Sequence, residues 1–193
     1  MQDKIYTALK NKVTGFTPIS DAEWADFSSK WQMVEINKDD YLIKEGQIEH
    51  YFYFVFDGVL RAFATKDGDE ICIGFSYNGD FSGAYDSFLA QTKSEFAIQA
   101  LTKSTLLKIN RENLFLLFDK YKSIERWGRL FNAEILIGMA KRQVEARSYS
   151  AEEKYLRLLN QSPHIFQLVP QKHLASYLGM TAETFSRLRK KKR

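Results

Sequence analysis

The spacing of apolar residues changes twice along the chain and divides it into three parts. Helical spacing opens the chain, where Ser20 and Glu23 form a capping-box pattern ahead of one helix. From Met33 to residue 109, β-branched and aromatic runs follow the spacing of strands, with turns such as Asp57-Gly58 between them. Helical spacing returns at Arg111. The pattern predicts an α+β fold.

The strand-like part is expected to fold as an antiparallel roll. Strands are predicted at residues 51–56, 59–65, 70–77, 96–100 and 105–109, and a short β-segment is predicted separately at residues 165–168, ahead of the C-terminal helices. Their turns recur at roughly ten-residue spacing, which is typical of a jelly roll or barrel.

A long helix is predicted at residues 111–147, where no proline interrupts the pattern. Its apolar residues, among them Trp127, Phe131 and Met139, occupy more than one face, so the helix needs a partner on two sides. One partner is the roll. The other is expected to be the same helix of a second copy, since symmetric dimers dominate soluble oligomers. An ordinary core helix of a monomer is the alternative.

Residues 171–193 predict two short helices joined by a tight turn. Gly179 stands where the first helix must end, because glycine takes positive φ at little cost. Thr181 is placed to cap the second helix, from which Phe185 and Leu188 point back into the domain. This is the pattern of a helix-turn-helix, whose second helix enters the DNA major groove.

The open face of the second helix carries groups suited to DNA. By helical spacing, Glu183, Ser186 and Arg187 share this face. Arg can pair with guanine, Glu can accept from cytosine N4, and Ser can contact either base or phosphate. The residues expected to contact phosphates are Thr181, Thr184, Arg189 and Lys190. Arg189 and Lys190 begin a basic run that ends at Arg193. An exposed amphipathic hairpin with a solvated charged tail is the alternative.

The charge distribution favours a polyanionic partner at this end of the chain. The whole chain has a net charge of +4, whereas residues 148–193 alone carry nine Lys/Arg and three Asp/Glu. Double-stranded DNA is preferred over a membrane surface, because the apolar face of the hairpin is needed for its own packing.

Cysteine and histidine use argues against a metal centre or a disulfide. Cys72 is the single cysteine and alternates with apolar neighbours, so a buried filler role is expected. His50, His164 and His173 lack metal-ligand spacing and are expected in loops or at the surface. No catalytic constellation is found, so the chain is not expected to be an enzyme. Without a signal segment or a long apolar run, it is expected in the cytoplasm.

The order of roll, long helix and helix-turn-helix resembles the Crp/Fnr family of bacterial transcription regulators over nearly the whole chain. The motifs that carry the resemblance are Lys44-Glu-Gly46, the hairpin at residues 53–61, Gly79-Asp80-Phe81 and the run at residues 183–187. The resemblance implies a homodimer on a two-fold symmetric operator, with RNA polymerase as a further partner. It also implies three domains: a sensor roll at 1–118, a dimerisation helix at 119–147 and a DNA-binding helix-turn-helix at 148–193.

The sequence departs from the cyclic-nucleotide pattern of that family. Members that bind the nucleotide hold its phosphate with an Arg-Ser or Arg-Thr pair, but here Ser94 and Glu95 take those places. A carboxylate there would repel a phosphate, so no cyclic nucleotide and no other cofactor is expected. The residues that would line an effector pocket are Gly79, Asp80, Lys93 and Ser94. Neither the cluster-binding cysteines of the oxygen-sensing branch nor a β-wing beyond the recognition helix is expected.

A different function remains open at this point. The roll could sense a small molecule while the helical tail serves protein contacts instead of DNA. Binding to duplex DNA with a steep salt dependence would favour the DNA-binding function over the function through protein contacts, because neutralising phosphates releases counterions and protein contacts need not do so.

Overall fold

The computed structural model describes residues 2–191, which pack as two units. Unit 1 comprises residues 2–62 and 75–134, and unit 2 comprises residues 63–74 and 135–191. Among the described residues, no helix combines the length and apolar character needed to cross a bilayer.

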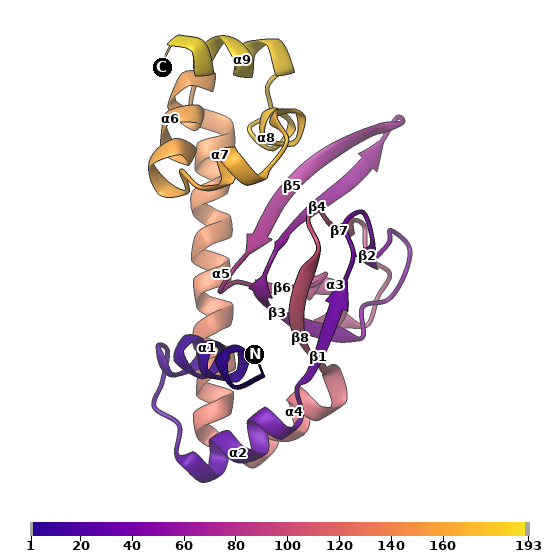
Figure 1. The fold of residues 1–193 in the computed structure, drawn as a ribbon, viewed down its shortest axis with the longest axis vertical. Helices are drawn as coiled ribbons and strands as arrows, with labels where there is room; N and C mark the ends of the chain where they lie inside the picture. The colour runs from indigo at the N-terminus through magenta and orange to yellow at the C-terminus, as the bar shows by residue number, and fades with distance from the viewer. Residues whose placement is uncertain (1, 192–193) are drawn as a thin grey trace. The chain divides into compact units, whose positions relative to one another are not determined.

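In the described part of the chain, unit 1 is built on a pair of sheets with strand orders β1-β8-β3-β6 and β2-β7-β4-β5 (Figure 1). The strands are β1 (Gln32–Ile36), β2 (Tyr41–Ile43), β3 (Tyr51–Asp57), β4 (Val59–Lys66), β5 (Asp69–Tyr77), β6 (Phe81–Ser82), β7 (Ala97–Ala100) and β8 (Ser104–Asn110). Strands β1 and β3 both pair antiparallel with β8, and β2 pairs antiparallel with β7. The predicted antiparallel roll is confirmed. Strands β4 and β5 run on from unit 1 into unit 2.

Strand β3 is buried on both faces, which explains its unbroken aromatic run. Phe52 and Phe54 belong to a cluster with the helices of unit 1, whereas Tyr53 and Val55 belong to the core between the two sheets. Because successive side chains of a strand point to opposite faces, only a strand with a packed layer on each side buries all four.

Helices cover the outer face of the first sheet. The helices of unit 1 are α1 (Gln2–Thr14), α2 (Asp21–Ser29), α3 (Tyr85–Ala90), α4 (Arg111–Lys120) and the first part of α5 (Lys122–Ser148). The predicted capping box of α2 is confirmed: Ser20 Oγ accepts the Glu23 N–H at 3.3 Å, and Glu23 Oε2 accepts the Ser20 N–H at 2.8 Å. Gly128 lets α5 approach α4, because a Cβ there would lie 2.7 Å from the Phe118 ring.

Unit 2 contains the rest of α5 and the C-terminal helices. These helices are α6 (Ala151–Gln161), α7 (Ile165–Leu168), α8 (Gln171–Tyr177) and α9 (Ala182–Lys191). The rings of Tyr155, Phe166 and Phe185 pack together with centroids 5.4–5.9 Å apart and join α6, α7 and α9. The α+β class with roll, long helix and C-terminal helix-turn-helix is therefore confirmed.

Three local predictions are wrong. The helix predicted at residues 111–147 breaks at Tyr121, whose backbone is extended and whose hydroxyl donates to Asp26 Oδ2 at 2.9 Å. Residues 165–168 form α7 instead of a strand, because Phe166 must turn toward Phe185. His173 is buried within α8 and is not a surface residue.

Candidate nucleic-acid interface and sensor site

The turn between α8 and α9 has the geometry that its glycine predicts. Gly179 has φ +66°, and the Met180 N–H donates to the Ala175 carbonyl at 3.0 Å. This bond closes the end of α8 over a left-handed residue, as in a Schellman turn. Any residue with a Cβ would be strained at this φ.

Thr181 caps α9. Its Oγ1 accepts the Thr184 N–H at 3.2 Å and donates to Thr184 Oγ1 at 3.1 Å, while its carbonyl accepts the Phe185 N–H at 3.0 Å. The predicted cap is confirmed. The two threonine hydroxyls proposed for phosphates therefore also bind each other, with Thr181 exposed and Thr184 half-buried.

Helix α9 has one buried face and one open face. Phe185 and Leu188 are buried against the other helices of unit 2. Glu183 and Arg187 are both exposed and lie four residues apart, so their side chains share the open face. One carboxylate acceptor and one guanidinium donor are thus held side by side on a rigid element.

A basic hollow of about 210 Å³ lies at the edge of this face. Its lining residues are Gln171 of α8 and Ser186, Arg189 and Lys190 of α9. All four side chains carry hydrogen-bond donors and none is acidic, so the hollow suits an anion. Sequence reasoning grouped Ser186 with the base readers and missed Gln171, whose only sequence signal is its place directly after Pro170. Lys192 and Arg193, the last residues of the predicted basic run, lie outside the described residues.

The residues predicted for an effector pocket lie in two turns of unit 1. Gly79 and Asp80 form one turn, in which Asp80 Oδ2 accepts the Tyr77 N–H at 3.1 Å. Lys93 and Ser94 lie in the other, where Lys93 forms a β-bridge with Ile48. Ser94 is buried, and its hydroxyl donates to the Phe96 carbonyl at 2.7 Å.

A buried carboxylate that the sequence did not indicate belongs to Glu49, which directly follows Ile48, the bridge partner of Lys93. Glu49 is 2% exposed; its Oε1 accepts the Tyr51 N–H at 3.0 Å, and its Oε2 accepts the Ala84 N–H at 3.4 Å. Burial raises the pKa of the Glu49 carboxyl to about 7, because its backbone donors offset the lost hydration only in part. The Ser87 hydroxyl accepts the Glu49 N–H at 3.0 Å and ties this segment to α3.

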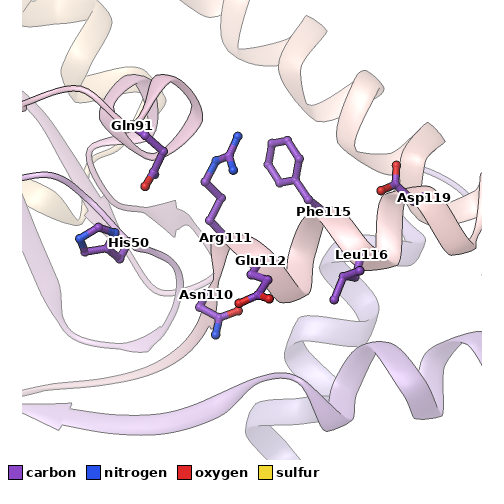
Figure 2. Close-up of a pocket in the computed structure, with 8 residues that line it drawn as sticks. All are labelled: His50, Gln91, Asn110, Arg111, Glu112, Phe115, Leu116 and Asp119. Carbon is purple, nitrogen blue, oxygen red and sulfur yellow. The ribbon is translucent and has the colours of Figure 1, made fainter.

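A further cavity lies at the start of α4 (Figure 2). It measures about 440 Å³ and is lined by His50, Gln91, Asn110, Arg111, Glu112, Phe115, Leu116 and Asp119. The Arg111 guanidinium lies 4.1 Å from the centroid of the Phe115 ring, and these side chains stand next to each other in the view. Since Glu112 and Asp119 offset the charge of Arg111, the cavity does not select an anion, and it contains none of the four predicted pocket residues.

Comparison with known proteins places the roll in a family. Residues 33–121 match the cyclic nucleotide-binding domain. The fumarate and nitrate reduction regulatory protein of Salmonella typhi is 31% identical over 165 residues, which cover 79% of this chain and 65% of that protein. The same regulator from Escherichia coli K12 is 30% identical with the same coverage. Over 79% of its length the chain is similar to these regulators, which agrees with the resemblance to the Crp/Fnr family. It spans slightly less than two thirds of the length of these curated relatives.

Solved structures of other proteins share the fold. FixK2 from Bradyrhizobium japonicum has a TM-score of 0.73 at 19% identity, covering 83% of each chain. The c-di-GMP responsive regulator CLP of Xanthomonas campestris has a TM-score of 0.66 at 20% identity, covering 89% of this chain and 91% of CLP. At these identities the likeness concerns the fold alone.

The roll of this chain does not fit the cyclic phosphate that its match to the cyclic nucleotide-binding domain implies. A bound phosphate needs donors and a cationic partner. Here the Ala84 N–H faces the Glu49 carboxylate, and the Ser94 hydroxyl donates to the Phe96 carbonyl. The buried carboxylate would also repel the ligand.

Proposed function

We propose that this chain is a sequence-specific DNA-binding regulator of transcription that acts in the cytoplasm as a homodimer on a two-fold symmetric operator. The observation that carries the proposal is the pair Glu183 and Arg187, exposed on the open face of α9 while Phe185 and Leu188 fix the opposite face. In a major groove, Arg187 would donate to the O6/N7 edge of guanine and Glu183 would accept from cytosine N4. The 30–31% identical relatives are regulatory proteins by name.

Replacing Arg187 tests the base contact. We expect Arg187→Ala to cost roughly 1–3 kcal/mol on the preferred operator and to reduce the preference over a scrambled duplex, because a bidentate base contact is lost. The operator is first selected from a random duplex pool, and both duplexes are then titrated at one salt concentration. Lys38→Ala removes the same charge from an exposed turn of unit 1 and should leave the preference unchanged. Equal operator binding by wild type and Arg187→Ala would contradict the assignment.

The basic hollow is assigned to the DNA backbone. Arg189 and Lys190 would neutralise a phosphate, with Gln171 and Ser186 donating to its oxygens. We expect Arg189→Ala to weaken binding to operator and scrambled duplex by the same factor. It should also reduce the slope of log K against log salt by about 1, since one phosphate contact is lost. The titrations are repeated over a range of salt concentrations. A loss confined to the operator would instead make Arg189 a base reader.

The second half of α5 supports the dimer. Within residues 2–191 it leaves large apolar side chains exposed, namely Leu136 at 69%, Ile137 at 56%, Met139 at 60% and Val144 at 59%. Contiguous exposed apolar side chains of this kind usually mark a surface that another protein chain covers. A second copy of α5 offers a matching surface, and a two-fold dimer places two recognition helices on two half-sites.

The remaining parts are assigned by the same proposal. Residues 1–118 serve as the sensor, 119–147 as the dimerisation helix and 148–193 as the DNA reader, with RNA polymerase as the partner at promoters. No catalytic step and no cyclic nucleotide is part of the proposal. If the wild type binds duplex DNA without steep salt dependence, the alternative of a sensor acting through protein contacts replaces it.

A further inference from the structure

Within unit 2, the hydroxyl of Ser176 in the helix-turn-helix forms hydrogen bonds with strand β5 of the roll. Ser176 Oγ, near the end of α8, accepts the Cys72 N–H at 2.9 Å and donates to the Glu70 carbonyl at 3.2 Å. Both partners belong to β5, the last strand in the order β2-β7-β4-β5. Edge strands leave backbone N–H and C=O groups that need partners. Ser176 satisfies two of these groups, as a residue of a neighbouring strand would.

The next residue ties α8 to a different element. The Tyr177 ring lies 4.8 Å from the Arg142 guanidinium of α5, and its hydroxyl accepts a hydrogen bond from the same group. Two consecutive residues therefore fix the end of α8 to β5 on one side and to α5 on the other. Because α8 packs against α9, this double attachment also sets the direction of the reading helix.

The attachment leaves the reading face open. Glu183 and Arg187 are exposed while both Ser176 bonds are made. A contact that covered these side chains would block DNA, but this one holds the helix-turn-helix without touching them. Its consequence is therefore alignment.

We propose that Ser176 is a positioning residue for DNA reading, through which strand β5 of the sensor roll holds α8 and, through α8, the recognition helix α9. The inference rests on the proposed DNA-binding function. In addition to α5, strand β5 would then connect the sensor with the DNA-binding helices, because β5 has residues in both unit 1 and unit 2. A change in the roll that shifts β5 would move α8 through these two hydrogen bonds.

The test compares Ser176→Ala, which removes the hydroxyl, with Ser176→Thr, which keeps it. Amide hydrogen exchange of residues 69–74 in the DNA-free full chain reports the contact. Titration with the selected operator and a scrambled duplex at fixed salt reports its effect. Ser148→Ala is the control, since that hydroxyl donates to the Val144 carbonyl of its own helix.

We expect Ser176→Ala to speed exchange of the Cys72 amide about tenfold and to weaken operator binding about 3- to 10-fold, the range that one or two hydrogen bonds produce. The thermal midpoint should stay within a degree or two of the wild type, and Ser176→Thr should restore both readouts. Unchanged exchange would overturn the contact. Faster exchange with equal or tighter operator binding would overturn the positioning role. If the wild type binds neither duplex, the DNA-binding proposal itself is overturned. The exchange measurement still tests the Ser176 contact in that case, because it uses the DNA-free chain.

Discussion

Replacing Glu49 by glutamine should remove a pH-dependent loss of stability worth roughly 3 kcal/mol. The buried carboxyl has a pKa of about 7 in the fold, against an ordinary value of 4.5. Below pH 4.5 the group is protonated in both the folded and the unfolded chain, so its ionisation has no cost. As the pH rises from 4.5 to 7, only the unfolded chain releases the proton, and the free energy of unfolding falls. Above pH 7 the loss is constant.

Denaturant unfolding between pH 4.5 and 8, at one protein concentration, measures this prediction. The difference in unfolding free energy between Glu49→Gln and wild type should change by the stated amount across that range, in favour of the variant at higher pH. Glu95→Gln provides the matched control, because it makes the same chemical change at an exposed position near the same turns. Parallel stability curves for Glu49→Gln and wild type would show that the carboxyl is hydrated or paired.

A carboxylate placed in the exposed apolar stripe of α5, which consists of Leu136, Ile137, Met139 and Val144, should dissociate the proposed dimer. Leu136 is 69% exposed, so Leu136→Glu removes little packing within one chain. At the interface with a second α5, the same change would bury an unpaired charge. We expect a monomer of unchanged secondary structure by light scattering and circular dichroism. Its operator affinity should fall about 100-fold or more, since the two half-sites are no longer bound by linked recognition helices.

A charge control makes the result specific to the stripe. Lys141→Glu places a carboxylate at an exposed polar position of the same helix and should leave both the dimer and operator binding largely intact. A Leu136→Glu protein that remains dimeric at micromolar concentration would show that dimerisation uses another surface.

Sequence reasoning succeeded where the determinants are local. The capping box at Ser20 and Glu23 and the turn at Gly179 depend on residues a few positions apart, and both have the predicted geometry. The apolar pattern of the strands likewise predicted the roll. Helix α9 followed from spacing alone, because its cap at Thr181 and its buried residues Phe185 and Leu188 lie within one short segment.

The failures share a different cause, which is contact between distant segments. The burial of Glu49 depends on the backbone of Ala84, 35 positions away, and no pattern around Glu49 indicates it. The helix break at Tyr121 involves no proline or glycine and coincides with a hydrogen bond to Asp26. Residues 165–168 are too few to show a period, so their helix is set by ring packing with α6 and α9.

The unit that bears the helix-turn-helix is not one continuous piece of chain. Residues 63–74 belong to it, although the whole of residues 75–134, which belong to unit 1, separates them from the rest of the unit. A chimera that exchanged only residues 148–193 between relatives would transfer α8 and α9 without the β5 residues Glu70 and Cys72, to which Ser176 is hydrogen-bonded. The natural boundary for modular exchange, whether in evolution or in the laboratory, therefore includes the hairpin of β4 and β5 together with the C-terminal helices.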